Sequence, residues 1–175
     1  MPTLKVPISF SDHILGPESA ELTLLEYGDF ECVDCGQAYP VVKDVQEHFG
    51  ENLRFAFRNF PLTHTHAHAE TAAQAAEFAA THGKFWEMHD LLFENQDDLT
   101  PAALIRYAET LELPGADLRR ALESRTFRQR VRDDFTGGVR SGVSGTPTFF
   151  INGRRHEGAF DFDILVDALA LARAA

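Results

Sequence analysis

Cysteine is scarce in this chain, with only Cys32 and Cys35 among 175 residues. Two cysteines are too few for the disulfide framework that stabilises small secreted domains, so any cysteine chemistry depends on this pair. Long apolar runs are also missing, because no stretch approaches the roughly 20 residues that a membrane span needs. The N-terminal segment lacks the apolar core of a secretory signal, which predicts a cytoplasmic protein, or a periplasmic one if a leader has been removed.

Basic residues are also few compared with acidic ones. Lysine and arginine number 16 against 27 acidic residues, so the formal net charge at pH 7 is −11. Nucleic acids and anionic membranes attract basic surfaces, and this balance therefore argues against both as partners. The share of hydrophobic residues, 44%, is that of a globular protein and excludes a disordered tail or a fibre. The length predicts a single domain.

The first third of the chain has the pattern of a βαβ unit. Residues 22–27 are mostly apolar, with Glu26 as the one charged residue; apolar residues then recur at helical spacing over 32–49 and alternate with other residues over 53–58. A strand, a helix and a strand in so short a segment are typical of two parallel strands joined by a helix.

The rest of the chain is first helical and then returns to strands. Residues 62–142 carry apolar positions at helical spacing, and they far exceed the dozen or so residues that a crossover needs. Residues 148–157 have the pattern of a hairpin that turns at Asn152-Gly153, and a last helix follows. The fold class is therefore α/β, with an all-helical insertion at 62–142 between the two parts of one core, residues 1–61 and 143–175.

The sequence Cys32-Val33-Asp34-Cys35 lies between the first predicted strand and the first predicted helix. A helix N-terminus presents unpaired N–H groups and a partial positive charge, and both favour a thiolate. Two intervening residues let the second sulfur fold back on the first within one turn, which suits a reversible disulfide. Beside a βαβ pattern, this spacing predicts a thioredoxin-like redox centre.

Two other uses of the cysteines stay open at this point. Zinc could be bound by Cys32, Cys35 and two of three nearby histidines, which would make the chain a non-catalytic, zinc-stabilised binding module. These histidines are His64, His66 and His68. Alternatively, one cysteine is a nucleophile with a histidine base, although no spacing singles out that base. A redox centre needs neither a metal nor an organic cofactor, and it is the preferred interpretation.

Three segments resemble those of a known family. LEYGDFECVDCG at 25–36 resembles the active-site region of DsbA-like thiol–disulfide oxidoreductases, which belong to the thioredoxin superfamily. SGTPTFFING at 144–153 resembles the cis-proline loop and hairpin of that family, and FWEMHDLLF at 85–93 is similar to a segment of its helical insertion. The similarity runs from about residue 22 to residue 160 and is greatest to the soluble, leaderless bacterial members.

The resemblance implies a role for each site residue. Cys32 would be the exposed attacking thiolate, and Cys35 would be the buried resolving thiol. Pro147 would follow a cis peptide bond, and the backbone of Thr146 would pair with an extended substrate segment. Glu26 would be a buried acid that relays the proton of Cys35, and burial beside apolar neighbours is expected to raise its pKa.

The residues between the cysteines depart from the family pattern. The strongly oxidising member has Pro-His there, whereas this chain has Val33 and Asp34. A carboxylate at Asp34 would raise the pKa of Cys32 relative to a histidine, which makes the disulfide a weaker oxidant. The expected function is exchange with protein or small-molecule thiols and disulfides, with a reductase or isomerase role favoured over an oxidase role. A glutathione-dependent isomerase or transferase on the same fold is the alternative.

Overall fold

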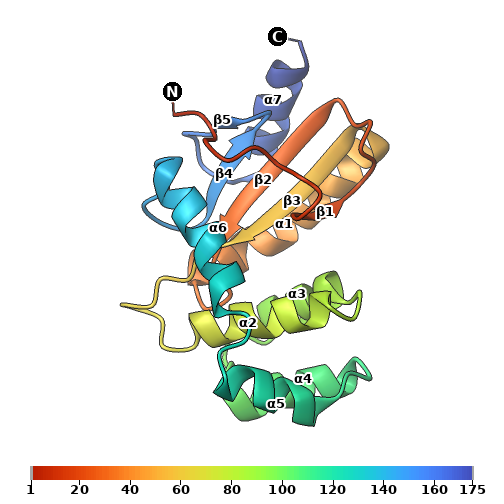
Figure 1. The fold of residues 1–175 in the computed structure, drawn as a ribbon. Coiled ribbons are helices and arrows are strands. Elements are labelled where there is room, and N and C mark those ends of the chain that lie inside the picture. Colours follow the sequence, from red (N-terminus) through yellow and green to blue (C-terminus); the bar gives the residue numbers. More distant parts are fainter. Residues whose placement is uncertain (1, 175) are drawn as a thin grey trace.

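A five-stranded mixed sheet forms the centre of the fold in the computed structural model, which describes residues 2–174 (Figure 1). The strand order is β1–β3–β2–β4–β5, in which β2 and β3 are parallel and the other neighbouring pairs are antiparallel. The parallel pair predicted from the sequence is therefore confirmed. The strands are β1 (His13–Leu15), β2 (Leu22–Gly28), β3 (Leu53–Asn59), β4 (Thr148–Ile151) and β5 (Arg154–Arg155).

Helices cover the sheet and extend beyond one end of it. Figure 1 shows α2 to α5 gathered past that end, while α1 and α7 lie along the sheet itself. The α/β class is confirmed, and the boundaries predicted at residues 61 and 143 stay a prediction. None of the helices within residues 2–174 is long and apolar enough to cross a membrane. The helices are α1 (Val33–Phe49), α2 (Ala69–Ala80), α3 (Phe85–Glu94), α4 (Pro101–Thr110), α5 (Gly115–Glu123), α6 (Arg128–Arg140) and α7 (Phe162–Arg173).

Both faces of the sheet are buried, which explains the continuous apolar run of β2. Leu24 and Phe55 belong to the larger core, which packs against α1, α2, α3 and α7. Leu25 and Tyr27 belong to a smaller cluster on the other face, against which Phe135 of α6 packs. Because strand side chains alternate between faces, β2 delivers its even-numbered residues to the side of the sheet that α1 covers.

Alanine makes α2 the central helix of the helical part. Ala72, Ala75, Ala76 and Ala79 are completely buried, and neighbouring helices α3, α4, α5 and α6 all contact α2. Small side chains on every face let the surrounding helices approach closely, so the helix is buried all round rather than along one stripe. The alanine-rich stretch thus serves packing.

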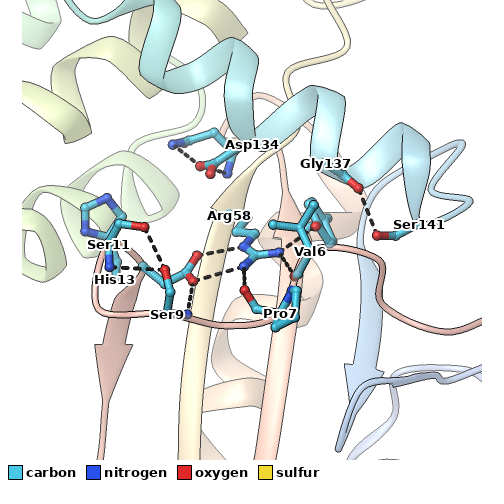
Figure 2. Close-up of polar contacts among 12 residues, drawn as sticks. Val6, Pro7, Ser9, Ser11, His13, Arg58, Asp134, Gly137 and Ser141 are labelled. Carbon is cyan, nitrogen blue, oxygen red and sulfur yellow. Dashed lines mark hydrogen bonds and ion pairs between the residues drawn. The ribbon is translucent and has the colours of Figure 1, made fainter.

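Arg58 on β3 holds the N-terminal segment across the sheet (Figure 2). Its guanidinium donates hydrogen bonds to the carbonyl oxygens of Val6 and Pro7, at 2.8 and 3.0 Å. It also donates two bonds to the Asp12 carboxylate, at 2.7 and 2.9 Å. Both side chains of this pair are buried, and charge-assisted bonds offset the cost of removing the charges from water. The anchored segment includes β1, which the sequence analysis missed because three residues are too short for a periodic pattern.

The C-terminal hairpin is shorter than predicted. The Asn152-Gly153 turn is present, with positive φ values of 46° and 77°, but β5 ends at Arg155 and not at residue 157. The N–H of His156 still donates to the carbonyl of Phe149 at 2.9 Å. Its imidazole bonds to the carbonyl of Ala159 at 2.9 Å, which turns the chain away from the sheet and toward α7.

Candidate active site

The end of β2 and the start of α1 position the two cysteines. Cys32 has an extended backbone and is the N-cap residue of α1, which begins at Val33. Its carbonyl accepts the first helical hydrogen bond, from the N–H of Gly36 at 3.1 Å. The cysteine pair therefore lies at a helix N-terminus, as the sequence predicts, and Cys35 is one turn further along.

The two thiols differ in their contacts. Both are free, and 7% of the surface of Cys32 is exposed against 0% for Cys35. The Cys32 thiol donates to the carbonyl of Thr146 at 3.4 Å, and the Cys35 sulfur accepts from the N–H of Asp29 at 3.5 Å. The order of exposure agrees with the expected roles. However, Cys32 is less exposed than predicted, because the loop that carries Thr146 lies against its sulfur.

The pKa values of the two thiols are driven apart. A hydrogen bond from the Cys35 thiol, with further bonds from the backbone N–H groups of Cys35 and Asp34, lowers the pKa of Cys32 to about 5 against the opposing effect of burial. Burial raises the pKa of Cys35 well above 9.0, and donating to Cys32 and facing the charges of Glu26 and Cys32 raise it further. At neutral pH the pair is therefore one thiolate and one thiol.

The residues between the cysteines are exposed. Val33 keeps 67% of its surface accessible and places an apolar side chain next to Cys32. Asp34 is exposed too, and its backbone N–H is one of the groups that lower the pKa of Cys32. The helix start thus acts on the thiolate through backbone donors, as expected for an unpaired first turn.

Glu26 lies beneath the pair, on the central strand. It pairs in register with Phe57 on β3 and Phe149 on β4, and it is 2% exposed. Within residues 2–174, its Oε1 atom has no hydrogen-bond partner. Burial, and secondarily the charge of Cys32, raise the pKa of Glu26 to about 8, which confirms the direction predicted from its apolar surroundings.

The loop before β4, which is far from the cysteines in the sequence, covers another side of the site. The Thr146–Pro147 peptide bond is cis, and both residues are half-buried. The bond from Cys32 to the Thr146 carbonyl joins residues separated by 114 positions. The two motifs singled out in the sequence therefore meet at the Cys32 sulfur.

Gln96 is a site residue that the sequence analysis missed. It lies between α3 and α4, and its Nε2 donates to the carbonyls of Phe30 and Cys32, both at 2.8 Å. A Cβ atom on Gly36 would lie 1.9 Å from the Gln96 Oε1 atom, so a larger residue after Cys35 would displace the Gln96 amide. The helical part of the chain is thus hydrogen-bonded directly to the cysteine motif.

Asp29 is the second residue that was missed. Its carboxylate is 0% exposed and accepts three hydrogen bonds at 2.8 Å, from the N–H groups of Glu31 and Leu62 and from the His66 ring. It thereby joins the end of β2, the start of α1 and the loop between β3 and α2. A Gly-Asp-Phe sequence carries no local pattern that marks such a contact.

Two histidines of that loop pair with carboxylates, and none forms a metal site with the cysteines within residues 2–174. His66 pairs with Asp29, and His68 pairs with Glu31 at 3.1 Å, while His64 is exposed. Across residues 2–174, no three histidine, cysteine, aspartate or glutamate side chains are grouped so that they could hold a metal ion. The geometry therefore gives the zinc-module alternative no support.

Solved structures share this fold over nearly the whole chain. BdbD from Bacillus subtilis matches with a TM-score of 0.87 and 24% identity, covering 99% of this chain and 96% of that one. A thioredoxin-like oxidoreductase from Silicibacter pomeroyi matches with a TM-score of 0.84 and 24% identity, covering 95% of each chain. Wolbachia pipientis alpha-DsbA1 matches with a TM-score of 0.80 and 20% identity, covering 98% of this chain and 94% of that one.

Relatives with higher sequence identity are much longer proteins. Na(+)/H(+) antiporter NhaA 1 from Salinispora arenicola is 47% identical over 170 residues, which are 97% of this chain and 26% of the antiporter. NhaA 1 from Mycobacterium sp. strain KMS is 42% identical over 164 residues, or 93% of this chain and 27% of the antiporter. The chain thus spans about a quarter of the length of these relatives.

The family assignment covers both halves of the site. Residues 9–170 match the family described as thioredoxin, a span that includes the cysteine pair, Glu26 and the Thr146–Pro147 loop. The fold comparisons add the DsbA-like arrangement, with helices between β3 and β4. The chain therefore belongs to the thioredoxin family, with the DsbA-like form of its fold.

Proposed function

We propose that this DsbA-like disulfide oxidoreductase exchanges disulfides with protein substrates, using Cys32 to attack and Cys35 to resolve. The observation that carries the proposal is the opposite shift of two adjacent thiols, with the pKa of Cys32 lowered to about 5 and that of Cys35 raised. The thiolate is the nucleophile in disulfide exchange, so Cys32 can attack at neutral pH, whereas Cys35 stays protonated until the resolving step.

Only sulfur atoms exchange bonds and electrons in the reaction. The Cys32 thiolate attacks one sulfur of a substrate disulfide; a Cys32–substrate bond forms, and the second substrate sulfur leaves as a thiolate. Cys35 then loses its proton and attacks the Cys32 sulfur, which releases the first substrate sulfur as a thiolate. The substrate has gained two electrons, and Cys32 and Cys35 are joined; the reverse sequence oxidises a substrate dithiol.

Glu26 is placed to take the proton of Cys35. Formation of the mixed disulfide removes the negative charge of Cys32, which is one of the causes that raise the pKa of Glu26 and the pKa of Cys35. Both groups therefore become easier to deprotonate at the moment when resolution requires it. The attack by Cys32 in this way prepares the second step.

The substrate contacts belong to Thr146, Pro147 and Val33. The Thr146 carbonyl lies 3.4 Å from the Cys32 sulfur, so the backbone next to Pro147 lies where a substrate bonded to Cys32 would pass. Val33, the residue after Cys32, offers exposed apolar surface. An extended polypeptide, with its backbone donors and apolar side chains, fits this combination.

Two opposing effects set the direction of exchange. Stabilising the Cys32 thiolate stabilises the dithiol form and makes the disulfide more oxidising, whereas a negative charge at Asp34 works against that thiolate. We propose that Asp34 makes the Cys32–Cys35 disulfide a weaker oxidant, which suits a reductase or isomerase role. This finer assignment rests on Asp34 being exposed directly after the helix start, within about one turn of the sulfur.

Replacement of the resolving thiol tests the two cysteine roles. When it is mixed with a disulfide-containing protein such as insulin, the Cys35→Ser variant should accumulate mixed disulfides, because no second thiol attacks the Cys32–substrate bond. The Cys32→Ser variant should accumulate none, since the remaining thiol is buried and protonated. Non-reducing gel electrophoresis with mass spectrometry measures both; equal trapping by the two variants would contradict the assignment. Undiminished turnover of Cys35→Ser with glutathione would favour the glutathione-dependent alternative.

Replacement of the buried acid tests the proton relay. In the native protein, resolution should accelerate as the pH rises through the Glu26 pKa of the mixed disulfide, which lies below about 8 because the charge of Cys32 is gone. Glu26→Gln should slow resolution and move its acceleration to higher pH, where Cys35 itself ionises, while leaving attack by Cys32 in place. Stopped-flow exchange with a peptide disulfide between about pH 6 and pH 9 separates the two steps. An unchanged profile for the resolving step would make the carboxyl merely structural.

Replacement of Asp34 tests the direction of exchange. Asp34→His should lower the pKa of Cys32 further and raise the reduction potential by tens of millivolts, where about 30 mV corresponds to 1.4 kcal/mol for this couple. Asp44→His, an exposed substitution further along the same helix, is the matched control and should shift neither quantity. Thiolate absorbance and equilibration with glutathione measure the two shifts. If the Asp34 variant is no more oxidising than the native protein, Asp34 does not set the direction.

A further inference from the structure

We infer that His66 is a positioning residue for the exchange reaction, held by the Asp29 carboxylate so that an imidazolium charge lies next to the Cys32 thiolate. The inference rests on the proposed function of the cysteine pair and assigns a new residue to it. His66 lies in the loop between β3 and α2, which no motif of the sequence connects with the cysteines.

The first support is the geometry of the His66–Asp29 pair. The His66 Nδ1 atom lies 2.8 Å from Oδ2 of Asp29, whose carboxylate is completely buried, while the histidine side chain keeps 23% exposure. The buried carboxylate fixes the ring and makes Nδ1 the donor, as such pairs do in other proteins. The exposed fraction of the ring leaves its second nitrogen free to exchange a proton with solvent.

The second support is that Asp29 also contacts both cysteines. Its carbonyl accepts from the N–H of Cys32 at 3.1 Å, and its own N–H donates to the Cys35 sulfur at 3.5 Å. One buried residue thus fixes the ring, the Cys32 backbone and the Cys35 sulfur in relation to one another. Any movement of His66 away from the redox pair would break a bond to a carboxylate that has no access to water.

The third support is the set of charges around the ring. The groups that face His66 are Asp29, Glu31 and the Cys32 thiolate, all of them negative when ionised. Burial alone would lower the pKa of His66, but the hydrogen bond to Asp29 and the three negative charges raise it above its ordinary value. The cysteine motif itself supplies no positive side chain, since its intervening residues are Val33 and Asp34.

A redox-linked proton follows from this arrangement. Reduction of the disulfide adds two electrons and one proton, leaving the Cys32 thiolate and the Cys35 thiol. The new negative charge strengthens proton binding at His66, so the pKa of His66 must be higher in the dithiol form than in the disulfide form. The imidazolium in turn favours reduction at low pH, and this effect is lost as the pH rises through the His66 pKa of the dithiol form.

The direct test is to titrate the histidine rings by NMR in the full chain, in the dithiol and the disulfide forms. The His66 signal should titrate at higher pH in the dithiol form, whereas exposed His64 of the same loop should titrate identically in both. Reduced Cys32→Ser, which carries no thiolate, should behave like the disulfide form at His66. Identical titration of His66 in the dithiol and disulfide forms would overturn the inference.

A substitution supplies the second measurement. His66→Gln removes the charge but keeps an N–H donor for Asp29, and His64→Gln is the matched control. His66→Gln should move the midpoint of Cys32 alkylation to higher pH and lower the reduction potential, while His64→Gln changes neither. An unchanged potential and alkylation rate would also overturn the inference. Exchange with insulin, assayed in parallel on the native protein, tests the proposed function separately: the redox-linked titration of His66 survives even where that exchange fails.

Discussion

The buried carboxylate of Asp29 is the contact on which the site depends. It accepts hydrogen bonds from the turn before Cys32 and from the loop after β3, and its backbone bonds to both cysteines. A carboxylate removed from water is costly unless every bond is made, so the surrounding segments are held in one arrangement. Gln96 fixes the same turn from the helical side. Two polar side chains therefore align strand, helix start and insertion around the sulfurs.

This rigid arrangement explains how one motif holds two thiols with very different pKa values. Cys32 accepts hydrogen bonds from the Cys35 thiol and from the first turn of α1, which together outweigh the penalty of its partial burial. The Cys35 thiol is buried, it faces the Glu26 carboxyl, and it donates a hydrogen bond to Cys32. The same hydrogen bond thus lowers one pKa and raises the other. The Glu26 carboxyl, whose Oε1 has no hydrogen-bond partner within residues 2–174, is uncharged at neutral pH and preserves this asymmetry, because a full negative charge there would oppose the thiolate.

Sequence patterns predicted what local periodicity and spacing determine. The strand that carries Glu26, the helix that begins after Cys32 and the parallel partner strand all follow from apolar spacing, and the raised pKa of Glu26 follows from its apolar neighbours. Asp29 and Gln96 were missed because their partners are backbone groups brought near by the fold, which no side-chain pattern records. The N-terminal strand β1 was missed because three residues are too short for a periodic pattern, and pairing with β3 sets its place. Exposure of Cys32 was overestimated because the covering loop comes from the other end of the chain.

The central claim is that the fold keeps Cys32 as a thiolate and Cys35 as a thiol at neutral pH. Thiolate absorbance near 240 nm, recorded against pH for the dithiol form with the disulfide form subtracted, tests this most directly. One thiolate should appear with a midpoint near pH 5, and the second should still be absent at pH 9.0, which is the ordinary pKa of a cysteine thiol. Two thiolates that appear together near 9.0, with none formed at neutral pH, would contradict it.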